Sequence, residues 1–193
     1  MSLYNIGWDN SGVFYNRVME DEYLRGNQRN GIRMLAFDPE EKVWKATKKF
    51  FRSNEECFEK GLVRNNQTVY NFVVVQSNNS NDRFVLIGSK GHVALSNAAF
   101  SAIREIKVRY AGEVAFDMKG RVLWWDNSSG HYKPPRATLE TNCPFPIEKF
   151  WDIQDQKQEL EEYCKDGLHK TLPKRLIGIS RKQIVHLSHK RFF

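Results

Sequence analysis

The stretch that decides the fold is TVYNFVVV, residues 68–75, which is followed after a short polar segment by RFVLI, residues 83–87. Both segments are rich in β-branched and aromatic residues, which favour strands. The polar segment between them, residues 78–82, contains only Asn, Ser and Asp and is typical of a turn. The two segments therefore predict an antiparallel hairpin, and their nearly continuous apolar runs predict a central place in a sheet.

The chain after this hairpin continues the strand pattern. Residues 92–95 predict a short strand and residues 98–102 a helical turn. Ile106, Val108 and Tyr110 alternate with basic residues, as in a strand with one wet face, and residues 111–116 extend it. With a turn at 117–120 and a return strand over 121–126, the sequence predicts one antiparallel sheet of about five strands between residues 67 and 126.

Helices are predicted on both sides of this sheet. Asp38 and Pro39 precede two glutamates, the pattern of a helix start, and predict a helix over residues 39–52. An S-x-x-E motif beginning at Ser53 predicts a second helix over residues 54–60. Apolar residues at helical spacing predict a third helix from about residue 147 to 164.

The predicted fold class is therefore α+β, with helices before and after the sheet. We expect a single domain over residues 1–193, since no linker or repeat divides the chain. Its predicted parts are an N-terminal helical part over about 1–62, the sheet over about 67–126, and a C-terminal helix with a basic tail over about 146–193.

The composition bounds the class of protein. With 193 residues, 40% hydrophobic and 13% aromatic, the chain can bury a proper core and is not typical of a disordered protein. No apolar run approaches the roughly 18 residues that span a bilayer. The first residues lack a basic region followed by an apolar one, so we expect a cytoplasmic protein, or one secreted without a conventional signal peptide.

The charge favours an anionic partner. Thirty Lys and Arg against 23 Asp and Glu give a formal net charge of +7. The three cysteines, Cys57, Cys143 and Cys164, show no C-x-x-C spacing, which favours a reducing compartment over a disulfide framework or a zinc ribbon. No metal or cofactor is predicted.

Most familiar catalytic motifs are absent from the sequence: it contains no P-loop, dinucleotide fingerprint, G-x-S-x-G, H-E-x-x-H or EF-hand loop. What remains is WWDNSSGHYKPP, residues 124–135, which combines an acid, hydroxyls, an imidazole and a lysine after a predicted strand. Glu113 begins the other strand of the same hairpin. Because antiparallel partners meet at the open end of a hairpin, we expect Glu113 and His131 to lie near each other there.

This rim is the candidate site. An acid, an imidazole and a nearby cation suit general acid–base chemistry on a phosphate, as in metal-independent RNA cleavage. The predicted catalytic residues are Glu113, Asp126, His131 and Tyr132. The predicted substrate-binding residues are Lys133 and Arg136 on the loop, Trp125 as a stacking platform, and Arg181 and Lys182 in the basic tail.

Structural alternatives stay open for each feature. Residues 126–130 also suit an ordinary loop, in which Asp and Asn cap backbone amides. Successive strand residues face opposite sides of a sheet, so Trp124 and Trp125 can both be core residues. The basic tail can be a solvated end.

Part of this region resembles a known type of module. The segments AGEV (111–114), GRV (120–122) and NSSGHYKP (127–134) are similar to a pattern in poorly characterised bacterial secreted toxin and effector proteins. The resemblance covers about 25 residues and assigns no catalytic roles. It implies a bacterial or phage origin and an effector role.

The predicted function is that of an effector or toxin-like protein acting on an anionic substrate, with metal-independent RNA cleavage as the leading reaction. One alternative is transfer of ADP-ribose from NAD, with Tyr132 stacking on the ligand and Glu113 as the catalytic acid. The other is a non-enzymatic module that binds a host or target protein, a nucleic acid or an anionic surface through its basic end.

Overall fold

The computed structural model describes residues 32–47, 58–59, 69–77, 81–103 and 106–165. These residues form one antiparallel sheet with the strand order β3-β2-β1-β5-β4-β6-β7. Its strands are β1 (Arg33–Asp38), β2 (Val43–Thr47), β3 (Phe58–Glu59), β4 (Val69–Ser77), β5 (Arg83–Gly88), β6 (Ile106–Phe116) and β7 (Val122–Trp125). The helices are α1 (His92–Ile103), α2 (Leu139–Asn142) and α3 (Ile153–Lys165), with 3-10 turns η3 (Arg136–Thr138) and η4 (Ile147–Lys149).

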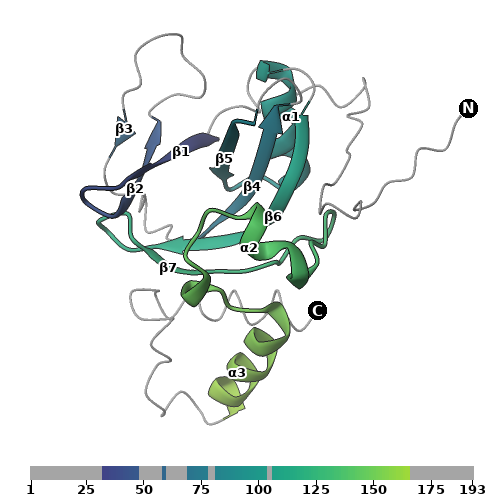
Figure 1. Cartoon of the computed structure of the whole chain (residues 1–193). Helices are drawn as coiled ribbons and strands as arrows, with labels where there is room; N and C mark the ends of the chain where they lie inside the picture. Colours follow the sequence, from purple (N-terminus) through teal and green to yellow (C-terminus); the bar gives the residue numbers. More distant parts are fainter. Residues whose placement is uncertain (1–31, 48–57, 60–68, 78–80, 104–105, 166–193) are drawn as a thin grey trace, which may run out of the picture.

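The sheet is strongly curved and nearly closes on itself (Figure 1). The backbone N–H of Trp44 on β2 donates a hydrogen bond of 2.8 Å to the carbonyl of Gly120, in the turn between β6 and β7. This bond joins β2, the second strand from one edge of the sheet, to the turn that precedes β7 at the other edge. Gly120 has a φ of +88°, and a Cβ there would lie 2.3 Å from the Trp44 carbonyl oxygen, so the near-closure requires glycine at this position.

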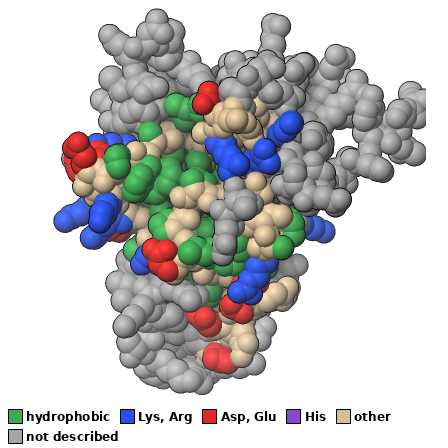
Figure 2. Space-filling model, viewed as in Figure 1, with side chains coloured by type: hydrophobic (Ala, Val, Ile, Leu, Met, Phe, Trp, Pro, Cys, Tyr) green, Lys and Arg blue, Asp and Glu red, His purple; other side chains and the backbone are tan. Residues whose placement is uncertain are grey.

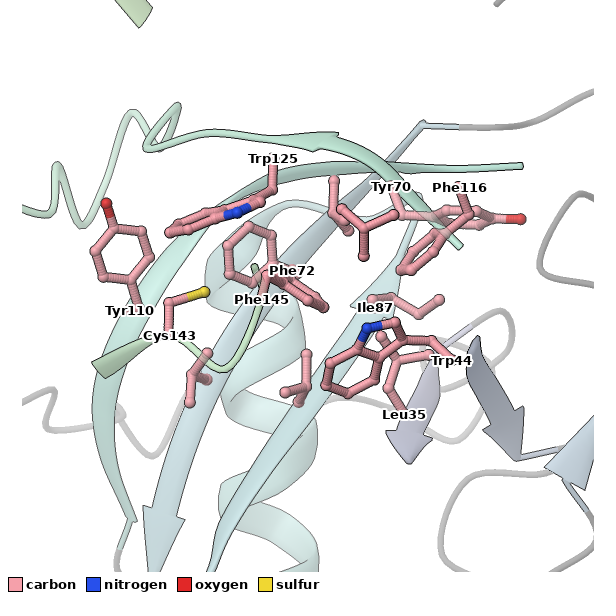
Figure 3. Close-up of a cluster of buried hydrophobic side chains, with 14 of the residues drawn as sticks. Leu35, Trp44, Tyr70, Phe72, Ile87, Tyr110, Phe116, Trp125, Cys143 and Phe145 are labelled. Atoms are coloured by element: carbon pink, nitrogen blue, oxygen red, sulfur yellow. The ribbon is translucent and has the colours of Figure 1, made fainter. Parts of the chain in front are cut away.

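Both faces of the sheet are buried. On the convex face, Leu95, Ala98 and Ala99 of α1 pack against Val73 and Val75 of β4 and their neighbours. The concave face carries the aromatic cluster drawn in Figure 3, with Phe145 at its centre. The Phe145 ring lies 5.0 Å from the rings of both Trp44 and Phe72. The segment after α2 therefore fills the interior of the curved sheet.

The central hairpin was predicted correctly. β4 and β5 pair in antiparallel register through Val74 and Val85. β6 runs unbroken from Ile106 to Phe116, and β7 returns beside it. None of the described helices is long and apolar enough to cross a membrane.

The helix predicted over residues 39–52 is wrong as far as residue 47. Residues 39–42 form a turn, and residues 43–47 are strand β2. The Asp38 carboxylate does accept the backbone N–H groups of Glu40 and Glu41, at 3.0 and 3.1 Å, as a helix cap would. Lys42 then takes a φ of 53°, which reverses the chain. The capping pattern marked a turn, and β2 buries Val43 and Trp44 in the core.

Three further assignments need correction. Residues 58–59 of the helix predicted over 54–60 form strand β3, and its other residues lie outside the described part. Residues 92–95 belong to helix α1, not to a strand. The sheet is also larger than predicted, because it extends back to Arg33 and so occupies part of the expected N-terminal helical part.

The last predicted helix begins later than expected. Residues 147–149 form a 3-10 turn, and α3 starts only at Ile153. Between them the N–H of Trp151 donates to the carbonyl of Trp125 at 2.8 Å, which holds this segment extended against β7. The hydrogen bond to β7, and not the helical spacing of the apolar residues, decides the backbone conformation of this segment.

Cys143 is buried in the aromatic cluster, and burial raises the pKa of its thiol. Because the thiolate is the reactive form, we expect Cys143 to resist alkylation by iodoacetamide at neutral pH in the folded protein. It should react fully once the protein is unfolded in guanidinium. Peptide mapping by mass spectrometry, which follows this cysteine alone, measures both rates. Equal rates in the two states would contradict this burial.

Candidate functional site

The candidate site lies at one end of the sheet, where four strands come into a single row. In the register, Asn71 of β4 lies opposite both Gly88 of β5 and Glu113 of β6. The N–H of Asp126 donates to the carbonyl of Glu113 at 2.9 Å, which adds the end of β7 to the row. The open end of the β6–β7 hairpin therefore lies beside the end of β5, where α1 begins.

Asp126 is a buried hydrogen-bond acceptor at the start of the loop. Its Oδ1 accepts the N–H of Glu113 at 2.7 Å and the N–H of Ser128 at 2.9 Å. Its Oδ2 accepts Nε2 of Gln156 at 2.8 Å. Gln156 also donates to the carbonyl of Trp151 at 2.7 Å. The carboxylate, which is fully buried, therefore joins β6, the loop and α3.

Tyr132 fixes the other end of the loop. Its ring is buried, and its hydroxyl shares a hydrogen bond of 2.5 Å with Oγ of Ser96 on α1. The N–H of Tyr132 donates to Oγ of Ser129 at 3.2 Å, and the N–H of Lys133 donates to the Ser129 carbonyl at 3.0 Å. The loop is therefore held on β6 and α3 by Asp126 and on α1 by Tyr132.

The outer surface of this loop is cationic. His131, Lys133 and Arg136 are exposed, while Tyr132 between the first two points into the core. Lys133 has a φ of 45°, an uncommon conformation for a residue with a side chain. The His131 ring packs edge-on against Tyr132, with 4.8 Å between ring centroids. The buried neighbours thus hold a surface turn on which basic side chains face the solvent.

Both tryptophans of the loop's preceding strand are buried. Trp125 packs in the concave cluster and donates from Nε1 to the carbonyl of Pro146 at 2.7 Å. Trp124 packs edge-on against Trp151, with 5.7 Å between ring centroids. Both tryptophans are therefore core residues, which was the structural alternative to a stacking platform. Trp125 offers no exposed face on which a base could stack.

The predicted acid and imidazole differ in exposure. Glu113 is only 3% exposed, in the same cross-strand row as Asn71, whereas His131 is at the surface of the loop. The predicted residues thus belong to one end of the sheet but divide into two layers. Glu113, Asp126 and Tyr132 lie beneath the surface, and His131, Lys133 and Arg136 lie on it. Arg181 and Lys182 lie outside the described residues.

Sequence reasoning missed the contribution of α1 to this end of the sheet. His92, its first residue, is half-buried and lies with Nε2 2.9 Å from the carbonyl of Gly112. Since a carbonyl only accepts, this nitrogen carries a proton. Asn71 donates from Nδ2 to the carbonyl of Lys90 at 2.9 Å, in the exposed Ser89–Gly91 turn. The signal was a strand followed by a glycine-flanked turn and a helix start. It was missed because residues 92–95 were assigned to a strand.

Gly112 shows how closely the backbones approach here. A Cβ on this residue would lie 1.9 Å from the carbonyl oxygen of Asp126 and 3.1 Å from a carbon of the Phe72 ring. Gly112 is therefore needed for the close packing of β6 against the start of the loop.

Within the described ranges, no three His, Cys, Asp or Glu side chains form a group that could hold a metal ion. Comparison of the chain with protein-family models, curated proteins and solved structures finds no match. The chemistry of the site is therefore argued from its own residues.

Proposed function

We propose that this protein binds RNA along the exposed basic residues at the α1 end of the sheet. One observation carries the proposal: the side chains that face the solvent on the loop are His131, Lys133 and Arg136, while Asp126 and Glu113 beneath them are buried. The surface therefore carries the cations Lys133 and Arg136 beside the His131 imidazole, and neither Asp126 nor Glu113 places a carboxylate on it. Such a surface suits the phosphates of a nucleic acid backbone.

A second loop extends this basic surface. Lys90 is exposed in the turn that enters α1, and its carbonyl is tied to Asn71 of the same row. Three strand spacings, roughly 15 Å, separate the two ends of the row. A ligand that contacts Lys90 as well as Lys133 needs more than one negative charge along its length. A single-stranded RNA has this property, and the net charge of +7 favours its approach.

For the reaction, we propose metal-independent cleavage with His131 as the proton-transfer group. It is the exposed imidazole of the loop, and a neutral imidazole takes or gives a proton near physiological pH. Lys133, two residues further along, would stabilise the negative charge that develops on the phosphate. Asp126 and Tyr132 are positioning residues in this proposal, because their polar atoms are engaged below the surface.

An effector or toxin-like role is part of the same proposal. Its support is the resemblance of residues 111–134 to modules of bacterial secreted toxins and effectors. ADP-ribose transfer is less well supported, because the Tyr132 ring that was expected to stack on NAD is buried against α1.

The first test measures RNA binding by fluorescence anisotropy with a labelled single-stranded oligoribonucleotide. We expect binding at low salt that weakens roughly tenfold or more as the salt is raised severalfold, because several phosphate contacts release counterions. Absence of binding at low salt would reject the proposed function.

A second measurement separates binding from chemistry. Incubated with total RNA in EDTA, the wild type should cleave it, and His131→Gln should cleave at least about 100-fold more slowly, the usual size of a general acid–base contribution. RNA affinity should change less than about threefold, since glutamine keeps a polar side chain of similar size that cannot transfer a proton. Binding without cleavage by the wild type would reject the reaction and leave the binding proposal standing.

A further inference from the structure

A second group of basic side chains lies at the opposite end of the sheet. In the register, Gln76 of β4 lies directly opposite Arg83 of β5 and Lys107 of β6. Residues directly opposite one another in antiparallel strands point to the same face. That face is the concave one, because Gln76 follows Val74 of the concave cluster by two positions.

A β-bulge adds Arg109 to this group. Val74 pairs with Tyr110 and Val75 with Val108, so Arg109 is the extra residue of β6. A bulge re-aims a side chain relative to the regular alternation. Here Nε of Arg109 donates to Oε1 of Gln76 at 2.6 Å. Lys107 and Arg109 are therefore neighbours on one strand that both lie beside Gln76.

Gln76 is the buried member of this group of side chains, and its amide holds Arg109 in place. It is only 7% exposed, and its Nε2 donates to Oδ1 of Asn81 at 3.3 Å. This bond fixes which end of the amide faces Arg109. Arg83 is exposed, while Lys107 and Arg109 are half-buried, so the three cations form a rim around a buried amide. We call Arg83, Lys107, Arg109 and Gln76 the Gln76 cluster.

The Gln76 cluster is separate from the loop described above. Gln76 lies five positions along β4 from Asn71, a distance of roughly 17 Å, and its side chain points to the other face of the sheet. In Figure 2, Lys and Arg side chains gather on the visible face next to an apolar surface. Binding at the cluster and binding at the loop can therefore be tested independently.

We propose that the Gln76 cluster is a binding site for a phosphate group. A ligand with two or more negative charges interacts more strongly with three cations on adjacent strands than a carboxylate with one does. Guanidinium groups also match the geometry of phosphate oxygens through paired N–H donors. The bulge and the buried amide hold one of these groups in place before a ligand arrives. The phosphate can belong to a small molecule or to an RNA strand.

The experiment titrates the full chain with inorganic pyrophosphate and, separately, with an oligoribonucleotide that has no terminal phosphate, both by isothermal calorimetry. The variants are Arg83→Gln and Arg109→Gln. The matched control is Arg121→Gln, which removes the same charge from an exposed residue at the β6–β7 turn, where Arg121 pairs with Asp117. Arg83 is exposed, so its replacement should leave the fold intact, which circular dichroism verifies.

We expect the wild type to bind pyrophosphate, and each cluster variant to bind it about tenfold more weakly, the usual effect of losing a charge-assisted hydrogen bond. Arg121→Gln should bind like the wild type. If the oligoribonucleotide shows the same pattern, the phosphate is that of RNA; if only pyrophosphate does, it is that of a small molecule. Two results would overturn the proposal. One is that the wild type does not bind millimolar pyrophosphate and the cluster variants bind RNA as the wild type does. The other is that all three variants lose the same affinity.

Discussion

Replacing Asp126 by alanine should lower the free energy of unfolding by about 3–5 kcal/mol, because two buried donors and one half-buried donor lose their acceptor. The carboxylate receives the N–H groups of Glu113 and Ser128 and the side-chain amide of Gln156. The donors of Glu113 and Gln156 are left in sites from which water is excluded. Since small domains are stable by only about 5–15 kcal/mol, this loss approaches the whole margin. Urea denaturation followed by tryptophan fluorescence measures it.

A graded series separates the lost hydrogen bonds from other effects of the substitution. Asp126→Asn keeps an oxygen for the two backbone donors but turns an amide toward Gln156, so we expect a smaller loss of about 1–2 kcal/mol. Asp155→Ala, which removes an exposed acid from the first turn of α3, should cost about 0.5 kcal/mol. An equal effect of all three substitutions would show that Asp126 is not the acceptor described.

Replacing Gly112 by alanine should prevent folding. The added Cβ would meet the carbonyl oxygen of Asp126 at 1.9 Å, and that oxygen belongs to backbone that cannot rotate away as a side chain would. Relief requires β6 and the start of the loop to separate, which would break the bonds between Glu113 and Asp126. We therefore expect no cooperative unfolding transition in calorimetry, or one at a much lower temperature.

The matched control for this substitution is Gly130→Ala. Gly130 lies in the same loop, is exposed, and has no atom within 4 Å of the position of an added Cβ. Its replacement should change the free energy of unfolding by less than about 1 kcal/mol. A Gly112→Ala protein as stable as Gly130→Ala would contradict the close approach of β6 and the loop.

The parts of the fold that the sequence predicts are those in which local preference and tertiary packing agree. The hairpin of β4 and β5 is rich in β-branched residues and is also buried on both faces, so pattern and structure coincide. Residues 39–47 show the opposite case. The cap at Asp38 is real, but the barrel-like closure places Trp44 in the aromatic cluster, and this requires a strand.

The sequence predicted the candidate site at the open end of the β6–β7 hairpin, while the depth of its residues could not be foreseen. Nothing in the order Asp126, His131, Tyr132 tells which side chain points inward. That depends on Ser96 and Gln156, which come from two helices distant in sequence. The misassignment of residues 92–95 also hid His92 and the turn before it.

At this end of the sheet the buried Asp126 carboxylate supports the loop, and we propose that the exposed cations bind the ligand. The proposed role of the cations is tested most directly by the RNA affinity of the double variant Lys133→Gln/Arg136→Gln, measured by anisotropy at low salt. The control is Lys119→Gln/Arg121→Gln, which removes two exposed charges at the other end of β7. We predict that the loop variant binds at least about tenfold more weakly than the control, with a shallower salt dependence. Equal affinity of the two double variants would contradict the account.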